Sequence, residues 1–254
     1  MPSVPNSTQD QKTAARLGWG VHIFTASGIV VGMLALEAVY DNLEKLAIIY
    51  LLITQLIDGI DGPMARNLNV RQTVPKIDGY VLDLVIDFVT CVVVPTVFLH
   101  QFGLLPEHLS LLICGLVVLL SAIWFSRTDM MTEDHWFRGF PATWNLIVPT
   151  LFVMESTQWM NAVLIVGLAV LMLTNVQFPH PVRVSENRLA TLPFTAIWIG
   201  ALLWGTLRLP NTDFLVQLAL YASISYYVVI CARRTIAARH TAVNSTQALP
   251  EIAV

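Results

Sequence analysis

The chain has 254 residues, of which 56% are hydrophobic and 12% are charged, and its net charge is −3. Soluble globular proteins carry about a quarter charged residues, so this composition excludes a soluble globular chain. A bilayer-crossing helix takes about 20 mostly apolar residues, and eight such helices with short loops use nearly the whole length. We therefore expect one membrane domain over residues 1–254, and no nucleic-acid partner.

Eight apolar segments follow one another along the chain and predict an all-α integral membrane bundle of eight transmembrane helices. The expected spans are 18–39, 44–65, 79–101, 107–127, 142–155, 158–177, 189–207 and 213–232. The break between the fifth and sixth spans consists only of Glu155 to Gln158. Residues 1–15 and 240–254 are expected to be mobile tails.

The basic residues indicate how the spans are oriented. With eight spans, 12 of the 14 Lys and Arg residues fall on one side of the bilayer, and only Lys45 and Arg208 fall on the other. Seven or nine spans would lose this asymmetry. The positive-inside rule then places both termini and the longer polar loops in the cytoplasm. Without an organellar targeting segment, we expect a multi-pass protein of a bacterial inner membrane, with its active site on the cytoplasmic side.

Four acidic residues lie where the second span ends and the third begins. The first stretch reads D-G-I-D-G-P-M-A-R from residue 58, and the second reads G-Y-V-L-D-L-V-I-D from residue 79. The four residues are Asp58, Asp61, Asp83 and Asp87. Their spacings of three and four place each pair on one face of a helix. Because the second span enters the cytoplasm and the third returns, both pairs should lie at similar depth.

Carboxylates in this position need a compensating partner. An ionised side chain inside a bilayer costs at least about 2.5 kcal/mol, and four converging carboxylates repel one another. Mg²⁺ and Mn²⁺ prefer oxygen ligands, and two such ions can clamp a phosphate between them. The small residues Gly59, Gly62 and Ala65 leave the helix surface bare for a bulky ligand, and Arg66 offers a fork to phosphate oxygens. Helix capping, the alternative, explains one or two of these acids but not both pairs.

These residues resemble the signature of the CDP-alcohol phosphotransferases, which move a phosphatidyl or phospho-alcohol group from a cytidine diphosphate donor. The resemblance implies that Asp58, Asp61 and Asp83 bind metal, and that Asp87 both binds metal and acts as the base toward the acceptor alcohol. It also implies a homodimer, with Arg66 at the diphosphate. The candidate residues for the donor, CDP-diacylglycerol, are His22, Thr25, Gly62, Ala65, Arg66 and Gly79. For His22 and Thr25, polar packing between helices is an equal alternative.

The stretch between Arg66 and Gly79 is longer than in the common family pattern, and this resembles the branch that condenses CDP-diacylglycerol with choline. Three further blocks are similar to that branch: V-H-I-F-T-A-S-G from residue 21, F-R-G-F-P-A-T-W-N from residue 137 and P-H-P-V-R-V from residue 179. The implied reaction gives phosphatidylcholine and CMP with Mn²⁺ or Mg²⁺, two ions being expected. Asp87 would take the proton of the choline hydroxyl.

A quaternary ammonium donates no ordinary hydrogen bonds, so it is best held by aromatic faces and a nearby acid. Aromatic residues, with two acids close by, are predicted on the cytoplasmic side. The candidates for choline are Tyr80, Trp136, Phe137, Phe140, Trp144, Glu133 and Asp134, and Trp19 lies on the same side. The alternative is an interfacial aromatic belt, which any membrane protein can carry.

Three questions stay open at this point. His180 and Arg183 could contact the donor phosphate or the lipid headgroup, although a juxtamembrane arginine more often anchors to anionic lipid. The acceptor could be serine, inositol or glycerol 3-phosphate, although anionic acceptors would favour an additional basic cluster. A cation transporter is a further alternative, but its acids would be expected near the midplane in several spans.

Overall fold

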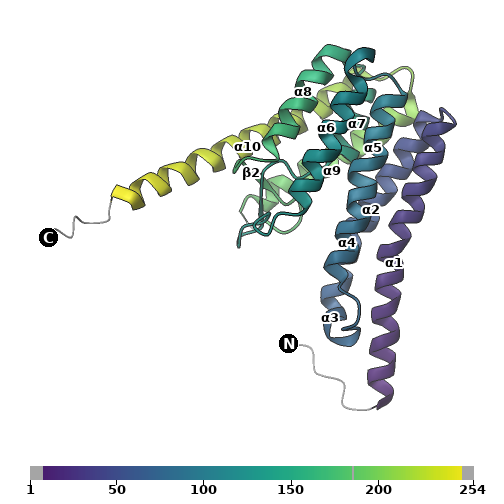
Figure 1. Cartoon of the computed structure of the whole chain (residues 1–254), viewed down its shortest axis with the longest axis vertical. Coiled ribbons are helices and arrows are strands. Elements are labelled where there is room, and N and C mark those ends of the chain that lie inside the picture. The colour runs from purple at the N-terminus through teal and green to yellow at the C-terminus, as the bar shows by residue number, and fades with distance from the viewer. Residues whose placement is uncertain (1–7, 185, 248–254) are drawn as a thin grey trace.

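The computed structural model describes residues 8–184 and 186–247, and most of these are helical (Figure 1). The helices are α1 (Thr8–Tyr40), α2 (Glu44–Asn67), α3 (Val70–Thr73), α4 (Gly79–Asp87), α5 (Val94–Gln101), α6 (Glu107–Phe125), α7 (Trp144–Val153), α8 (Gln158–Leu171), α9 (Arg188–Arg208) and α10 (Phe214–Gln247). A π-helical turn, Phe88–Val93, joins α4 to α5, and two short strands, β1 (Trp136–Arg138) and β2 (Gln177–Pro179), lie in the loops.

Six helical segments are long and apolar enough to cross a membrane, as expected of a multi-pass membrane protein. They are Gln9–Tyr40, Glu44–Asn67, Gly79–Gln101, Glu107–Phe125, Arg188–Arg208 and Phe214–Ala237. These segments coincide with the first four and last two predicted spans. At the predicted fifth and sixth spans, α7 and α8 are apolar but have only 10 and 14 residues. At about 1.5 Å per residue they are shorter than a hydrocarbon core of about 30 Å.

The third span changes its helical register just after the second pair of aspartates. The turn Phe88–Val93 has π-helical geometry, and Pro95 follows at the start of α5. Proline has no N–H to donate to the carbonyl four residues earlier, so a wider turn before it is a natural accommodation. The Thr90 hydroxyl donates to the Ile86 carbonyl at 3.1 Å and so supplies a bond within the altered register.

Helix α1 packs closely against the segment that carries Asp83 and Asp87. A Cβ added at Gly28 would lie 3.2 Å from Ile86, and one added at Gly32 would lie 2.9 Å from Thr90. Small residues let helix backbones approach closely where no hydrophobic effect drives association in lipid. The glycines of α1 therefore bring it against both aspartate-bearing helices, and Figure 1 shows α1, α2 and α4 running side by side.

The remaining helices surround a buried apolar core. It includes Phe98 of α5, Trp124 of α6, Trp144 of α7 and Ile165 of α8, each 2% exposed or less. The outward-facing side chains are also apolar, and Leu111 on α6 is 75% exposed. Such a surface suits contact with lipid rather than water.

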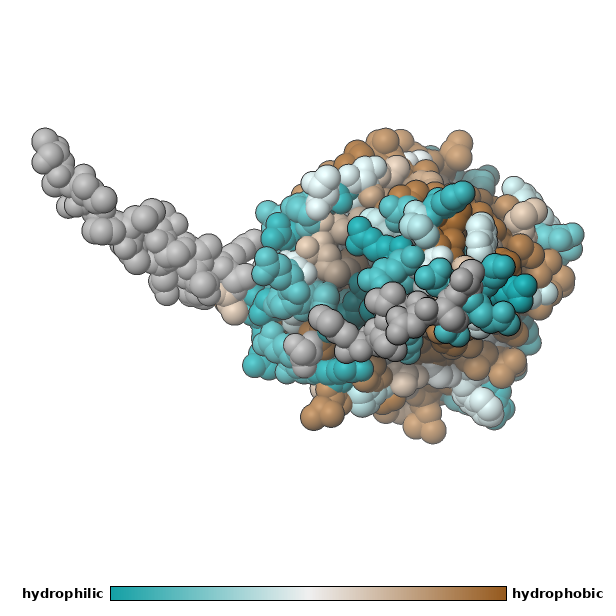
Figure 2. Space-filling view, turned by 90° about the horizontal axis from the view of Figure 1, so that it is seen from below, coloured by the Kyte–Doolittle hydropathy of each residue, from teal (hydrophilic) through white to brown (hydrophobic). Residues whose placement is uncertain are grey.

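Two loops meet at one end of the bundle through antiparallel pairing of β1 with β2, with Phe137 opposite Phe178. Because β1 precedes α7 and β2 follows α8, the α7–α8 pair starts and finishes at this same end. Helix α10 joins them, since the Gln177 amide donates to the Thr235 hydroxyl at 3.1 Å. Seen from below Figure 1, hydrophilic side chains gather over much of this end, with hydrophobic ones at its rim (Figure 2).

The predicted tails are partly helical. Helix α1 begins at Thr8 and α10 continues to Gln247, so residues 8–15 and 240–247 belong to these two helices. The remaining tail residues, 1–7 and 248–254, lie outside the described residues. The mobility of either tail stays a prediction.

Candidate active site

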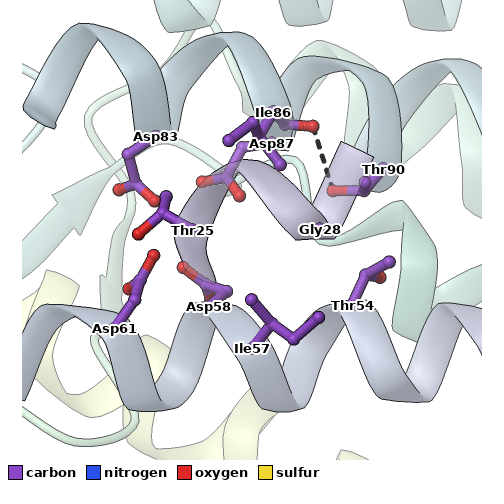
Figure 3. A pocket seen from close by; sticks show the side chains of 10 residues that line it. All are labelled: Thr25, Gly28, Thr54, Ile57, Asp58, Asp61, Asp83, Ile86, Asp87 and Thr90. Atoms are coloured by element: carbon purple, nitrogen blue, oxygen red, sulfur yellow. Dashed lines mark hydrogen bonds between the residues drawn. The ribbon is translucent and has the colours of Figure 1, made fainter. Parts of the chain in front are cut away.

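The four aspartates line one cavity between α2 and α4. Asp58 and Asp61 point from α2 toward Asp83 and Asp87 on α4, with Thr25 of α1 beside them (Figure 3). Oxygen atoms of Asp58, Asp83 and Asp87 all lie within 4.8 Å of one another. Asp61 is 6% exposed and lies beside Thr25 of α1. The predicted convergence of the two pairs is therefore present in the structure.

Local structure fixes the position of each pair. Asp78 caps α4, because its carboxylate accepts hydrogen bonds from the backbone amides of Tyr80 at 3.0 Å and Val81 at 3.3 Å. An aspartate at this position satisfies amides that the first helical turn leaves free. Helix α4 thus begins at Gly79, which places Asp83 on its second turn.

In the other pair, two side-chain amides in succession hold Asp58. Gln55 Nε2 donates to Asp58 Oδ2 at 3.2 Å, and Asn145 Nδ2 of α7 donates to Gln55 Oε1 at 2.9 Å. Asn145 is 1% exposed, and its Oδ1 has no hydrogen-bond partner in the described part of the chain. These two amide hydrogen bonds hold the Asp58 carboxylate in one orientation, as the hydrogen-bond partners of metal ligands do.

The chemistry of this cavity fits a divalent cation. Its lining offers several carboxylate oxygens and the hydroxyls of Thr25, Thr54 and Thr90, which are hard ligands. Within residues 8–184 and 186–247, none of the four carboxylates lies within 4.0 Å of a basic group. The cavity volume is about 10 Å³, which is room for roughly one water-sized particle. An ion fits this gap, and an organic group does not.

Two guanidinium groups lie over the bare surface of Gly62, beside the aspartates. A Cβ at Gly62 would be 3.2 Å from Arg66 Nη1 and 3.6 Å from Arg183 Nη2. Arg183 comes from the loop after β2, more than a hundred residues away in sequence. Gly62 therefore lies beneath two basic side chains, next to the cavity that the four aspartates line.

The other donor candidates take different positions. His22 is 6% exposed and lies against Gly79, where an added Cβ would be 3.3 Å from His22 Cε1. Its Nε2 has no partner within the described residues. Ala65 is partly buried on α2, one turn after Gly62. His22 and Gly79 thus connect α1 to α4, and none of these three residues is among those that line the aspartate cavity.

The structure does not assemble the aromatic candidates into one open cage. Trp144 is fully buried, and its indole N–H donates to Ser121 Oγ at 3.0 Å. Phe140 is 4% exposed and packs edge-on against Trp144 with ring centroids 4.8 Å apart. Both residues have the surroundings of core side chains and present no open face. Choline binding at these two positions has no support from the geometry.

The remaining candidates are dispersed. Trp136 is buried under the Arg234 guanidinium, whose Cζ lies 5.1 Å from the ring centroid, and Arg234 also pairs with Asp134. Phe137 stacks on the His180 ring, with centroids 5.4 Å apart. Tyr80 is 58% exposed at the start of α4. Glu133 and Trp19 are exposed as well.

Known proteins are similar to this chain over the segment that contains the site. The family model described as CDP-alcohol phosphatidyltransferase matches residues 21–176, a stretch that contains both aspartate pairs. The chain belongs to the CDP-alcohol phosphatidyltransferase family. This confirms the resemblance drawn from the signature residues and makes the chain a phosphatidyltransferase.

Curated members of this family align over most of the chain. The phosphatidylcholine synthase of Pseudomonas aeruginosa is 37% identical over 85% of this chain and 91% of its own length. The phosphatidylcholine synthase of Mesorhizobium japonicum is 39% identical over 72% of this chain and 69% of its own. That of Borreliella burgdorferi is 36% identical over 71% and 77%, respectively. The phosphatidyltransferase thus resembles enzymes of one named activity.

No local sequence pattern indicated a role for Gln55 or Asn145, and the role of Arg183 was left open between the donor phosphate and the lipid headgroup. Gln55 and Asn145 form the amide chain to Asp58, and Arg183 reaches Gly62. Asn145 and Arg183 fall within the sequence blocks that resembled the choline-specific branch, which was the available signal. Their partners are distant in sequence, so only the fold brings them to the aspartates.

Proposed function

We propose that this chain is a phosphatidylcholine synthase, which transfers the phosphatidyl group of CDP-diacylglycerol to choline and releases CMP. The convergence of Asp58, Asp83 and Asp87 within 4.8 Å carries the proposal, together with the activity named for the aligned relatives. The proposal also rests on the position of this cluster at one end of two apolar helices. Such a location lets acyl chains stay in the bilayer while the nucleotide stays in water.

Mn²⁺ or Mg²⁺ would be held by Asp58, Asp61, Asp83 and Asp87. We propose two ions on family resemblance, although the enclosed gap as it stands has room for one. When bound, the ions would offset the charge of the donor diphosphate and stabilise the departing CMP. The three threonine hydroxyls of the cavity would contribute further oxygen atoms. The amide chain from Asn145 would keep Asp58 oriented for this role.

Asp87 is the proposed general base. Its carboxylate would accept the proton of the choline hydroxyl as the choline oxygen forms a bond to the phosphorus that carries diacylglycerol. The bond from that phosphorus to the oxygen of CMP breaks, and CMP leaves with the electron pair. Arg66 would orient the diphosphate, with Gly62 and Ala65 leaving space for the nucleotide against α2.

For the membrane topology, we propose eight spans, cytoplasmic termini and a bacterial inner membrane, with the active site facing the cytoplasm. The short helices α7 and α8 would supply the fifth and sixth spans, since they start and finish at the end where β1 pairs with β2. The side with 12 of the 14 basic residues would be cytoplasmic. We also propose a homodimer, on family resemblance alone.

The proposal is tested by offering acceptors separately to purified protein with CDP-diacylglycerol and Mn²⁺. Labelled choline, serine, inositol and glycerol 3-phosphate are supplied in parallel, and labelled lipid and released CMP are counted. We expect labelled lipid and CMP when choline is supplied, and neither product with the other three alcohols. Product with another alcohol would retain a phosphatidyltransferase and reject the proposed acceptor.

A further inference from the structure

Arg183 occupies a position that sequence reasoning left open between donor binding and lipid anchoring. Its Nη2 atom would lie 3.6 Å from a Cβ at Gly62, and Arg66 Nη1 would lie 3.2 Å from the same point. The charge of Arg183 also acts on Asp58, Asp61 and Asp83. An arginine anchored to bilayer phosphates would instead extend to the rim of the helix bundle.

Within the described residues, the two guanidinium groups form no close ion pair. Among the described residues, neither Arg66 nor Arg183 has a carboxylate within 4.0 Å, whereas other arginines do. Arg234, for example, pairs with both Asp134 and Glu186. Adjacent like charges repel, so an anion between or above them would lower the energy of the arrangement. A dianionic group with several oxygen atoms offers more hydrogen-bond acceptors to two guanidinium groups than a single carboxylate does.

The turn that carries Arg183 is held in place. His180 Nδ1 accepts hydrogen bonds from the backbone amides of Val182 at 3.2 Å and Arg183 at 3.4 Å. The His180 ring in turn stacks on Phe137 of β1, with the two planes 16° apart. The guanidinium therefore starts from an ordered turn, which lowers the entropy cost of binding a ligand.

We propose that Arg183 and Arg66 together bind the diphosphate of CDP-diacylglycerol over Gly62. This inference rests on the proposed function, because it assigns a residue to the donor of that reaction. Arg66 binds the diphosphate from α2, and Arg183 binds it from the loop after β2. Arg183 is thus a substrate-binding residue contributed by the second half of the chain.

The test measures binding of CDP and of CMP to purified protein in a non-ionic detergent without anionic lipid, in the presence of Mn²⁺. The variants are Arg183→Ala, Arg183→Lys and Arg66→Ala. The matched control is Arg188→Ala, which removes an exposed arginine five residues further along. Loss of a charge-assisted contact to phosphate should weaken CDP binding by about tenfold to a hundredfold. The lysine variant should recover part of this loss, because it restores the charge without the fork.

We expect Arg183→Ala to weaken CDP binding more than CMP binding, to raise the KM for CDP-diacylglycerol and to leave the KM for choline unchanged. Equal CDP affinity in the wild type, Arg183→Ala and Arg188→Ala proteins would overturn the proposal. An effect of Arg183→Ala seen only in vesicles that contain phosphatidylglycerol, and absent in detergent, would also overturn it in favour of lipid anchoring.

The outcome does not depend on the identity of the acceptor. If the wild-type protein binds CDP through Arg183 but uses an alcohol other than choline, the donor inference stands and the proposed function fails. If it makes phosphatidylcholine while Arg183→Ala binds CDP normally, the function stands and the inference fails.

Discussion

Asp58 is oriented by two successive amide hydrogen bonds that no local sequence pattern predicts. Asn145 donates to Gln55, and Gln55 donates to Asp58, so a residue of α7 controls a proposed metal ligand on α2. Partners of this kind typically change metal affinity by about ten- to a hundredfold when they are removed. We therefore propose that α7 acts at the site by orienting Asp58.

Replacing Gln55 tests this orientation. We expect Gln55→Leu to raise the Mn²⁺ concentration needed for half-maximal activity by about tenfold or more, because the Asp58 carboxylate loses its donor. Excess Mn²⁺ should restore most of the turnover. Gln101→Leu is the control, since Gln101 donates to Asn42 at the opposite end of the third span. Unchanged Mn²⁺ dependence in Gln55→Leu would contradict the assignment.

Replacing Asp87 tests the general base. Asp87→Asn keeps the shape of the side chain but cannot accept the hydroxyl proton, so kcat should fall by about a hundredfold or more. Binding of CDP in the presence of Mn²⁺ should be retained within a few fold, because three carboxylates remain. The control is Asp213→Asn, an exposed acid paired with Arg208 at 3.8 Å. Wild-type turnover in Asp87→Asn would remove Asp87 from the mechanism.

His180 makes a pH-dependent contribution to stability. Burial, and then the charge of Arg183, lower the pKa of His180 from 6.5 to about 4. Between these values the unfolded chain binds a proton that the folded chain does not, so stability should fall as the pH drops from 6.5 toward 4. Protonation would also cost the two backbone hydrogen bonds that Nδ1 accepts.

We expect His180→Asn to reduce this pH dependence, since an asparagine oxygen can accept the same bonds without titrating. Thermal unfolding in detergent at pH 7 and pH 5 measures the effect. The loss of Tm on acidification should be smaller in His180→Asn than in the wild type. An equal loss in both proteins would assign the acid sensitivity to other groups.

At the scale of helices, α1 packs closely on the third span and so lines one side of the aspartate cavity. A Cβ at Gly32 would meet Thr90 Cγ2 at 2.9 Å, whereas nothing lies within 4 Å of a Cβ at Gly20. Gly32→Leu should therefore separate the helices and destabilise the fold by about 1–3 kcal/mol. Gly20→Leu, on the exposed side of the same helix, should unfold at the wild-type temperature. Equal Tm values for both variants would refute close packing at Gly32.

The sequence predicted the aspartate-bearing helices well because their spacing and their membrane cost are local properties. Asp58 to Asp87 could be placed on facing helix ends from periodicity alone. The π-helical turn after Asp87 was not foreseen, since it depends on Pro95 and on packing against α1. The contacts of Asn145 and Arg183 are long-range, and no local pattern encodes them.

For some of the aromatic candidates, the prediction from sequence has no support in the structure. Composition alone cannot separate an aromatic residue that faces a ligand from one that fills the core, because both positions favour large apolar rings. Trp144 and Phe140 fill the core, while Phe137 supports the turn that carries Arg183. Trp144 and Phe140 are therefore core side chains and do not face a ligand.

On the scale of the whole molecule, distant segments gather at one end of the bundle. Arg234 of α10 pairs with Glu186 from the loop after β2 and with Asp134 from the loop before β1. Arg183 from the same region reaches Gly62 near the end of α2. This arrangement agrees with the side on which the basic residues were predicted to lie.

The proposed topology predicts that both termini are cytoplasmic. Reporter fusions at the two ends should give high activity with a cytoplasm-dependent reporter and low activity with a periplasm-dependent one. A fusion in the loop 209–213 between α9 and α10 should give the reverse pattern. A periplasmic signal from either terminus would reject eight spans with both ends inside.

The most direct test of the central claim is the stoichiometry of the reaction in vesicles that contain CDP-diacylglycerol, purified protein, choline and Mn²⁺. We expect one CMP released for each phosphatidylcholine formed, with both products falling to background after EDTA and returning when Mn²⁺ is added in excess. CMP release without phosphatidylcholine, or phosphatidylcholine formed in the presence of EDTA, would contradict a metal-dependent transfer of the phosphatidyl group to choline.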